Sequence, residues 1–431
     1  MMPKILIVAD DLSGAADCAV ICATRGVETV VLIDATRVPQ GAVALAVDTN
    51  SRIMAPDEAG RAAARAIAHL QGRDTHVLYQ KIDSTLRGNW AVEVVHARRA
   101  AVELRGVAPL AIVAPAFPGT GRTTLGGRVL VRNVPLEQTE TWTREGLKGV
   151  ADVPLCLGGA GLRVELATLS IVRAGPEDLH AQLLRWREDG IEAVVCDAES
   201  DDDLAVIAAA SALLRGPVLH VGSAGLMRAL AANLEPHGPV RTAPESIDVE
   251  RPILTVVGSA SQISHTQFEI LASAPGVMAL TVPPQVLRLG VETAEAREIG
   301  HALDRVLASG HDVALAIGHA PEVDLREGSR LAAELAALIA PRVSELGGLV
   351  MTGGETARAI LIASGISGLR LRGEVEPGVP LGVGIGEHAV PVVTKAGAFG
   401  DQQTLLRCRA ALRPGQGGPG VAVALSDRPG R

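Results

Sequence analysis

Residues 4–17 read KILIVADDLSGAAD, and this stretch decides the fold that the sequence predicts. The apolar run from Ile5 to Ala9 predicts a buried strand, and the small and polar residues after Asp11 predict a turn into a helix. Open α/β sheets bind ligands at the carboxyl ends of their strands, so Asp10 and Asp11 are the first candidate site residues. The alternative is that one of them only caps the helix that begins near Ser13.

Length and composition limit what the chain can be. At 431 residues it is too long for one ordinary hydrophobic core, so we expect two domains. Hydrophobic residues make up 48% and charged residues 20%, which is typical of a packed globular protein. Aromatic residues make up only 2%, so Ala, Val, Leu and Ile must build the core. The net charge of −8 argues against nucleic acid and against an anionic membrane surface as partners.

The five cysteines, at positions 18, 22, 156, 196 and 408, are odd in number and scattered, which predicts reduced thiols in a cytoplasmic protein. Cys18 and Cys22 are one helical turn apart, but no His or second Cys pair completes a zinc site. No apolar run is long enough for a membrane helix, and Met1 to Lys4 leads directly into a strand instead of a signal peptide. The sequence leaves homo-oligomerisation open.

Strand-like and helix-like segments alternate through the first half, which predicts βαβ units and a mostly parallel sheet. The expected strands are 5–8, 29–33, 43–47, 77–80, 111–114, 193–197 and 218–221, and the expected helices include 57–70, 90–99, 176–187 and 202–214. Residues 120–161 break the alternation, and their Gly, Thr and Arg content predicts a long functional excursion.

Residues 235–252 contain four prolines and little apolar periodicity, which indicates a linker. The second half then restarts with expected strands at 253–257, 278–282, 313–317 and 349–351. The predicted fold class is therefore α/β, with two α/β domains of mostly parallel sheets joined by the Pro-rich linker. The predicted boundaries are 1–236 for the first domain, 250–413 for the second and 414–431 for a flexible tail.

The segment KIDSTLRG at 81–88 directly follows an expected strand and is the second candidate site. Arginine can hold a carboxylate or phosphate with two hydrogen bonds, and Asp and Ser can hold hydroxyl groups. Arg52 also follows a strand and adds a further cation. The cluster predicts a site for a small acidic, hydroxylated molecule, and the alternative is an exposed turn with solvated charges. Its polar members are Lys81, Asp83, Ser84, Thr85 and Arg87.

Three turns of the second half follow expected strands: VGSAS at 257–261, TGGETAR at 352–358 and KAGAFG at 395–400. Glycine lets backbone N–H groups approach a phosphate, and a helix that starts after the turn adds its positive end. Together the turns predict a nucleotide site, although none is the GxxxxGK[ST] P-loop. The dinucleotide-like GVGIG at 382–386 is discounted, because prolines precede it and no helix follows.

These segments together resemble the four-carbon acid sugar kinase family. The resemblance rests on ADDLSGAAD at 9–17, KIDSTLRG at 81–88, PAFP at 115–118 with Gly121 and Arg122, and TGGET at 352–356, in this order along the chain. It implies a sugar-acid-binding domain, a nucleotide-binding domain and an active site in the cleft between them. It further implies ATP- and Mg²⁺-dependent phosphorylation of the terminal (C4) hydroxyl of threonate, erythronate or 3-oxo-tetronate.

Carried over residue by residue, the resemblance implies substrate contacts at Asp11, Arg52, Lys81, Ile82, Asp83 and Ser84, which Asp10 and Arg87 join by their chemistry. It implies nucleotide contacts at Ser259, Gly353, Gly354, Glu355, Thr356 and Gly400. The last turn departs from the family pattern: Ala396 replaces the usual Ser and removes a hydroxyl contact, and Ala398 fills the variable position. No motif identifies the ligands of the metal.

In this interpretation Asp83 or Asp11 orients and deprotonates the attacking hydroxyl, while Lys81, Arg52 and Arg87 hold the substrate carboxylate. Asp83 is preferred as the base because its neighbourhood is crowded with polar groups.

Two other classes of function stay open. A haloacid-dehalogenase-like phosphatase places an Asp-x-Asp pair after its first strand, whereas here Asp10 and Asp11 are adjacent and Leu12 follows. A non-catalytic sugar-acid sensor would need no nucleotide site in residues 250–413. Neither alternative explains the motifs of both halves.

Overall fold

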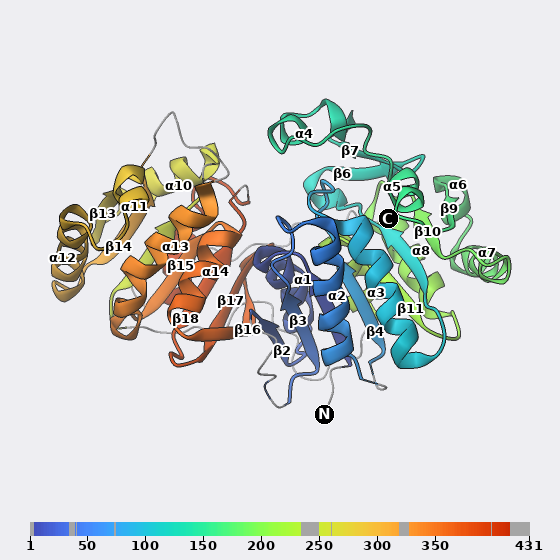
Figure 1. Cartoon of the computed structure of the whole chain (residues 1–431), viewed down its shortest axis with the longest axis horizontal. Helices are drawn as coiled ribbons and strands as arrows, with labels where there is room; N and C mark the ends of the chain where they lie inside the picture. Colours follow the sequence, from blue (N-terminus) through green and yellow to red (C-terminus); the bar gives the residue numbers. More distant parts are fainter. Residues whose placement is uncertain are drawn as a thin grey trace, which may run out of the picture.

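The computed structural model describes residues 4–33, 39, 41–72, 75–233, 250–259, 261–318, 327–397 and 399–413. Figure 1 shows the N-terminal half, in blue to green, beside the C-terminal half, in yellow to red, with helix α1 (Leu12–Thr24) near the middle. Within the described residues the strands form one 15-stranded sheet and one three-stranded sheet. The α/β class is confirmed.

The strands that the N-terminal half contributes to the large sheet are all parallel and run in the order β2-β3-β1-β4-β11-β5-β10-β9. All seven strands expected here are present to within a residue or two. The bounds are β1 Ile5–Ala9, β2 Thr29–Leu32, β3 Ala44–Asp48, β4 Val77–Lys81, β5 Leu110–Ala114, β9 Val164–Ala167, β10 Ala193–Cys196 and β11 Val218–Gly222.

The strands of the C-terminal half run in the order β13-β14-β12-β15-β18-β17-β16. The first five are parallel, and β16 and β17 form an antiparallel hairpin that the sequence did not predict. The bounds are β12 Ile253–Val257, β13 Val277–Val282, β14 Asp312–Ile317, β15 Gly348–Thr352, β16 Ile366–Glu376, β17 Val379–Gly386 and β18 Pro391–Lys395.

The hairpin joins the two halves, because β16 pairs antiparallel with β2. The two expected sheets are therefore one continuous sheet. The GVGIG segment lies in β17, where a Cβ on Gly384 would come within 2.6 Å of the His388 carbonyl oxygen. Glycine is needed there for close packing of the backbone, which agrees with discounting a dinucleotide site.

Helices cover both faces of the sheet. Those of the N-terminal half are α1, α2 Pro56–Leu70, α3 Trp90–Arg105, α6 Leu169–Val172, α7 Pro176–Glu188, α8 Asp201–Ala212 and α9 Ala224–Ala232. Those of the C-terminal half are α10 Gln262–Ala272, α11 Pro284–Leu289, α12 Ala294–Ala308, α13 Gly328–Ile339, α14 Gly354–Ala363 and α15 Thr404–Leu412. The four helices expected in the N-terminal half are present, although α3 extends six residues beyond position 99.

Residues 120–161 form a flap with secondary structure of its own. Its three-stranded antiparallel sheet consists of β6 (Arg122–Leu125), β7 (Arg128–Val131) and β8 (Val134–Pro135), and short helices α4 (Glu140–Arg144) and α5 (Val153–Gly159) follow. In Figure 1 the flap lies at the end of the N-terminal half opposite the N-terminus. It is placed at the end of this half where the parallel strands finish.

Helix α1 holds the two halves together. Its residues are small or apolar and are buried on nearly every side, and it packs against β3 and α9 of its own half and β16 and α14 of the other. One hydrophobic cluster accordingly includes Ala19 of α1, Leu254 of β12 and Leu369 of β16. Burial of this surface couples the stability of the two halves.

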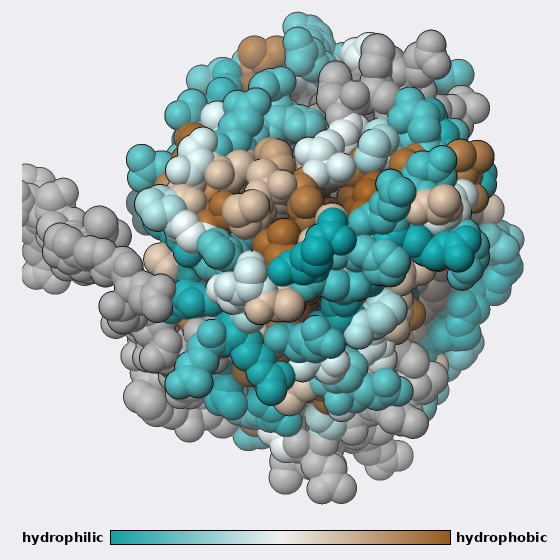
Figure 2. Space-filling model, turned by 90° about the vertical axis from the view of Figure 1, so that its left-hand side faces the viewer, coloured by the Kyte–Doolittle hydropathy of each residue, from teal (hydrophilic) through white to brown (hydrophobic). Residues whose placement is uncertain are grey.

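The edges of the sheet lie at the far ends of the molecule. Figure 2 views the outer end of the C-terminal half and shows apolar side chains gathered in a band between polar ones. The sheet ends at β13, where Met278 is 46% exposed. None of the helices that the structure describes is long and apolar enough to span a membrane. Residues 234–249, which include most of the proposed linker, and the proposed tail at 414–431 lie outside the described residues. The domain boundaries therefore stay a prediction.

An ion pair also connects the halves. Arg358 of α14 donates from Nε to Asp48 Oδ2 at 2.9 Å and from Nη2 to the Ile33 carbonyl at 3.4 Å. The side chain of Asp48 is fully buried, and burial raises its pKa to about 7 although the charge of Arg358 opposes the shift. Because the folded-state pKa lies above the unfolded value near 3.8, ionisation of Asp48 costs stability as the pH rises through 7.

Replacement of Arg358 by Leu should therefore destabilise the protein in a pH-dependent way. Without the guanidinium the pKa of Asp48 rises further, so the loss in the free energy of unfolding should grow from about 1 kcal/mol near pH 6 to about 3 kcal/mol near pH 8.5. Urea unfolding at the two pH values measures it. Arg61→Leu removes an exposed ion pair with Asp57 and should change neither value. Equal losses for Arg358→Leu at both pH values would contradict the assignment.

Candidate functional site

The candidate active site lies where strands β1, β3 and β4 end side by side. Strand β1 pairs in parallel with both neighbours, and Ala9 lies opposite Asp48 and Lys81. The loops that follow the three strands therefore leave from one edge of the sheet. The structure in this way brings Asp10, Asp11, Arg52 and residues 81–87 together, as the sequence predicted.

Arg52 is the centre of the cluster. Its guanidinium donates to both oxygens of Asp10, at 2.7 and 2.8 Å, and to both oxygens of Asp11, at 2.9 and 3.0 Å. Burial disfavours the charge of Arg52, but the two carboxylates outweigh burial, so its pKa lies well above the usual value. Arg52 is thus fully paired before any ligand binds.

Asp10 and Asp11 differ in accessibility. Asp10 is 3% exposed, and burial raises its pKa although Arg52 opposes the shift. The side chain of Asp11 is 22% exposed, and its Oδ1 also accepts the backbone N–H of Gly14 at 2.9 Å, which caps α1. Asp11 therefore caps the helix and also lies in the charged cluster. It is the member of the pair that a ligand can reach more easily.

Asp83 is held by its own loop. It accepts the backbone N–H of Thr85 at 2.9 Å and also the Thr85 hydroxyl, and Arg87 donates to its Oδ2 at 2.7 Å. Burial raises the pKa of Asp83, but Arg87 and Arg52 outweigh burial, so the pKa lies well below its usual range. A carboxylate of such low basicity is a poor proton acceptor, which counts against the preference for Asp83 as the base.

The other residues of this loop face either the site or the hydrophobic core. Lys81 is 5% exposed, and its ammonium donates to the Ile82 carbonyl at 3.1 Å. A Cβ on Gly14 would lie 2.6 Å from Asp11 Oδ1 and 2.9 Å from Lys81 Nζ, so both groups face the first turn of α1. Ile82 belongs to the hydrophobic core and can offer a ligand only its backbone, whereas Ser84 is half-buried.

Two non-glycine residues of these loops have positive φ angles, Asn50 at 51° and Leu86 at 57°. The left-handed region is unfavourable for L-residues, especially for one as bulky as Leu. Such strain often gathers in loops that position functional groups. Sequence motifs carried no signal of either residue's conformation.

The three Gly-containing turns of the C-terminal half converge at the ends of β12, β15 and β18. A Cβ on Gly258 would lie 2.0 Å from Thr356 Oγ1, and one on Gly397 would lie 2.0 Å from Ser259 Oγ. Gly353 has a φ of 92° and begins α14 without a capping side chain. The first backbone N–H groups of α14 therefore have no capping side chain and are able to bind an anion.

Two predicted nucleotide contacts differ in what they can offer. The side chain of Glu355 is exposed and accepts a hydrogen bond from Ser329 of α13 at 3.1 Å. Gly400 has a φ of 80°, and a Cβ there would lie 2.1 Å from Thr404 Oγ1. Gly400 can therefore act only through its backbone.

Lys395 fixes the conformation of the last turn. Its ammonium donates to the carbonyls of Ala396, Gly397 and Phe399 at 2.9, 3.1 and 3.1 Å. Burial lowers the pKa of Lys395 to about 8. Ala396 contributes its backbone, and Ala398 lies outside the described residues.

The two halves of the site meet at two helix N-termini. A Cβ on Gly354, the first residue of α14, would lie 2.9 Å from Ser13 Oγ and 3.3 Å from Asp11 Oδ2 at the start of α1. Both helices present their positive ends to this contact. The junction can hold a negatively charged group between the two halves.

No motif in the sequence predicted the buried carboxyl group of Glu93, which lies behind Arg52. Ser51 Oγ donates to Glu93 Oε1 at 2.6 Å, and Gln80 Nε2 donates to Glu93 Oε2 at 3.2 Å. Glu93 is 1% exposed, and burial, with Asp10 nearby, raises its pKa to about 8. The only sequence signal was a Glu on the apolar face of the helix after the 81–88 loop.

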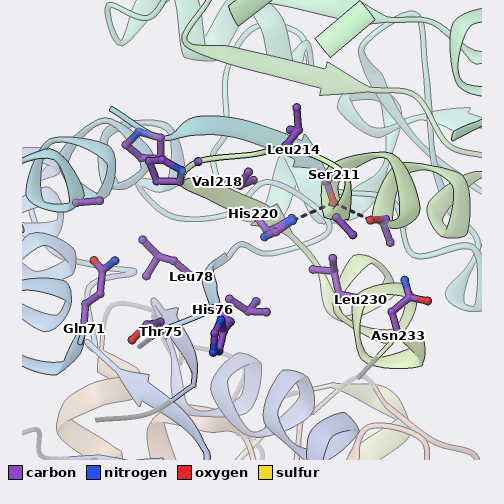
Figure 3. Close-up of a pocket in the computed structure, with 17 residues that line it drawn as sticks. Gln71, Thr75, His76, Leu78, Ser211, Leu214, Val218, His220, Leu230 and Asn233 are labelled. Atoms are coloured by element: carbon purple, nitrogen blue, oxygen red, sulfur yellow. Dashed lines mark hydrogen bonds between the residues drawn. The ribbon is translucent and has the colours of Figure 1, made fainter. Parts of the chain in front are cut away.

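The cavity in Figure 3, of about 260 Å³, lies at the amino ends of β4 and β11, far along the strands from the charged cluster. His220 bonds there to Ser211 at 3.1 Å, and burial lowers its pKa to about 4. Its described lining residues include no Asp, Glu, Lys or Arg. With no charge to balance an anion, this cavity is not the candidate active site.

Among the described residues, no group of three or more His, Cys, Asp or Glu side chains could hold a metal ion.

Two family models match the chain, a sugar-binding N-terminal domain over residues 5–230 and a nucleotide-binding C-terminal domain over 254–405. A D-threonate kinase of Cupriavidus necator is 46% identical over 94% of this chain and 97% of its own. A D-erythronate kinase of Heliobacterium modesticaldum is 31% identical over 94% and 96%. A crystal structure described as a putative tRNA synthase from Salmonella typhimurium shares the fold, with a TM-score of 0.80, 22% identity and coverage of 94% and 98%.

Replacement of Glu93 by Gln should remove a pH dependence of stability. The folded-state pKa of about 8 lies above the unfolded value of 4.5. The contribution of Glu93 to the free energy of unfolding of the wild type therefore falls as the pH rises between these values. Relative to Glu93→Gln, the wild type should lose about 2–4 kcal/mol over this range, measured by urea unfolding. Glu93→Ala, which loses both hydrogen bonds, should be less stable at every pH. A constant difference between wild type and Glu93→Gln would show that Glu93 is ionised in the fold.

Proposed function

Because this chain belongs to the four-carbon acid sugar kinase family, we propose that it transfers the terminal phosphoryl group of ATP to the C4 hydroxyl of a four-carbon sugar acid. The chain is a kinase of sugar acids. D-threonate is the first candidate acceptor, since it names the relative that is 46% identical, and D-erythronate is the second.

The contact between the two helix N-termini carries the proposal. The acceptor hydroxyl and the phosphoryl group must come into line at one point, and positioning with charge neutralisation supplies most of the catalysis. Asp11 and Ser13 lie against Gly354 at that point. A phosphoryl group held by the N-terminus of α14 would meet a hydroxyl held beside Asp11.

We assign the orientation of the acceptor hydroxyl to Asp11 in preference to Asp83. Asp11 is the more exposed carboxylate, at 22% against 12% for the side chain of Asp83, and it lies beside α14. Asp83 is occupied by Thr85 and Arg87 and is better suited to hold a substrate hydroxyl as a permanent acceptor. Lys81, which faces the same helix turn as Asp11, would stabilise negative charge on the transferred group.

The remaining substrate contacts in this proposal come from the loops around Arg52. Asp10 and Arg52 support the site by keeping Asp11 in place, while Ser84 and the backbone of Ile82 offer neutral hydrogen-bonding groups. Arg87 fixes Asp83.

On the nucleotide side, Ser259, residues 353–356 and Gly400 would bind the phosphates, chiefly through backbone N–H groups. The close contacts at Gly258 and Gly397 leave little room for side chains and so support a site built from the backbone. When bound, Mg²⁺ would supply positive charge that offsets the negative charge of the phosphates. No protein ligand is assigned to it.

We also propose domain boundaries of 1–236 for sugar-acid binding and 250–413 for nucleotide binding, with the active site in the cleft between them. The matched ranges of the two family models, 5–230 and 254–405, support this division. Domain closure over the substrates would exclude water, which otherwise competes for the phosphoryl group.

Neither of the two alternative functions accounts for both halves of the chain. A sensor has no need for the turns that meet at α14. A haloacid-dehalogenase-like phosphatase needs an Asp-x-Asp pair after the first strand, whereas Asp10 and Asp11 are adjacent and Leu12 follows.

An ADP-release assay over D- and L-threonate, D- and L-erythronate and 3-oxo-tetronates tests the function. We expect the fastest turnover with D-threonate, a requirement for Mg²⁺, and a product phosphorylated at C4 by phosphorus and carbon NMR. No turnover on any of these acids would end the proposal, and phosphorylation at C2 or C3 would correct the position.

Asp11→Asn distinguishes the two carboxylates. Asparagine caps helices as well as aspartate does, so the variant should fold, but kcat should fall by roughly 10²–10⁴ because the hydroxyl loses its proton acceptor. Asp83→Asn is the matched control and should mainly raise the KM for the sugar acid. The reverse result, a large fall in kcat for Asp83→Asn alone, would restore Asp83 as the base.

A further inference from the structure

The charges around the site are unequally paired. Arg52 is bound by Asp10 and Asp11, and Arg87 is bound by Asp83 and lies 3.6 Å from Glu145. Both arginines are therefore already opposed by protein carboxylates. A sugar acid brings a carboxylate that needs a cation, so a further positive group should be available to it.

Arg122 is such a group. It is the first residue of β6 in the flap, and among the described residues its side chain has no hydrogen-bond or ion-pair partner, although its Nε is buried. Glu145 of the same flap lies 3.6 Å from Arg87, which places the flap against the substrate loop. Burial lowers the pKa of Arg122; the charge of Asp83 opposes this shift, and those of Arg87 and Arg132 add to it.

The flap holds Arg122 in place before a ligand binds. The backbone of Arg122 exchanges two hydrogen bonds with Phe117, at 2.8 and 3.2 Å. The turn of the β6–β7 hairpin donates from the N–H groups of Gly126 and Gly127 to the buried carboxyl of Asp197, at 2.7 and 2.9 Å. Thr124 exchanges backbone hydrogen bonds with Ala198 after β10, at 2.8 and 3.1 Å. The unpaired cation is thus carried by a backbone fixed on both sides, which lowers the ordering cost of binding.

We propose that Arg122 binds the carboxylate of the acceptor and is the residue by which this enzyme selects a sugar acid over an uncharged polyol. The proposal rests on the proposed function and extends it. Arg52 and Arg87, which the sequence analysis assigned to the substrate carboxylate, are instead committed to protein carboxylates.

The position of Arg122 favours the substrate carboxylate over the transferred phosphoryl group. The flap that carries Arg122 meets the loop after β4, where Glu145 lies 3.6 Å from Arg87. The helix α14, which would carry the phosphates, instead meets Asp11 and Ser13. A four-carbon acid has its carboxylate and its C4 hydroxyl at opposite ends, so in this proposal the carboxylate faces the flap and the hydroxyl faces this junction. The bound carboxylate would also relieve the repulsion between Arg122 and Arg87.

The test compares Arg122→Gln with the wild type on D-threonate and on threitol, which has a hydroxymethyl group in place of the carboxylate. Loss of a charge-assisted hydrogen bond should raise the KM for D-threonate roughly 10- to 150-fold and leave the KM for ATP within about threefold. Turnover of threitol should change less than about threefold, so the preference for the acid should collapse. Arg122→Lys should keep part of the preference, because it keeps the charge and loses the planar geometry.

Stability separates binding from a structural role. Arg122 has no partner in the described structure, so Arg122→Gln should unfold at the wild-type temperature without ligand. D-threonate should raise the melting temperature of the wild type and not that of Arg122→Gln. Lys148→Gln, which removes an exposed cation of the same flap, controls for net charge and should behave as wild type in every measurement.

The outcomes of the two proposals are distinct. If the wild type phosphorylates tetronates but Arg122→Gln keeps its KM and its thermal response, the role of Arg122 is wrong and the kinase function stands. If tetronates bind and stabilise only the wild type without turnover, Arg122 is supported and the kinase function fails. If no tetronate is turned over or stabilises the wild type, both proposals fail.

Discussion

The structure of the site depends on the pairing of Arg52 with two adjacent carboxylates. One guanidinium binds Asp10 and Asp11 with four hydrogen bonds and thereby ties the loop after β3 to the loop after β1. Leaving any member of this buried group unpaired would carry a large desolvation cost, so the three side chains fix one another. Behind them, Ser51 and Glu93 complete the support. The charges that remain for ligands are consequently few and lie at the border of the cluster.

A second constraint acts between the two halves. Helix α1 begins at Asp11, in the site, and its buried sides pack against elements of both halves. Arg358 of α14 reaches Asp48, whose other oxygen accepts the backbone N–H of Asn50 in the loop that leads to Arg52. The helix that is proposed to bind phosphate is therefore connected by direct contacts to the loops proposed to bind the acceptor. A shift of α14 would displace both loops. These contacts are therefore a physical route for coupling the binding of the two substrates.

Much of the fold could be predicted because it depends on local patterns. The parallel strands are continuous apolar runs, and Gly, Pro and polar residues mark their ends, so β1, β4 and β12 were found to within about one residue. The hairpin β16–β17 was missed, because its glycines and prolines weaken the strand pattern and its partner β2 lies in the other half of the chain. The same nonlocal pairing turned two expected sheets into one.

The sequence by itself determined which residues gather at the site, because the loops that follow parallel strands leave from the same edge of the sheet. Only the tertiary structure decided how their charges are shared. Asp83 looked like a base in a crowded loop, but Arg87 and Thr85 occupy it. Arg122 looked like one more residue of a Gly-rich turn, but no described group pairs with it. Ion pairing depends on distances between side chains that are far apart in the chain, and no spacing of residues along a sequence contains those distances.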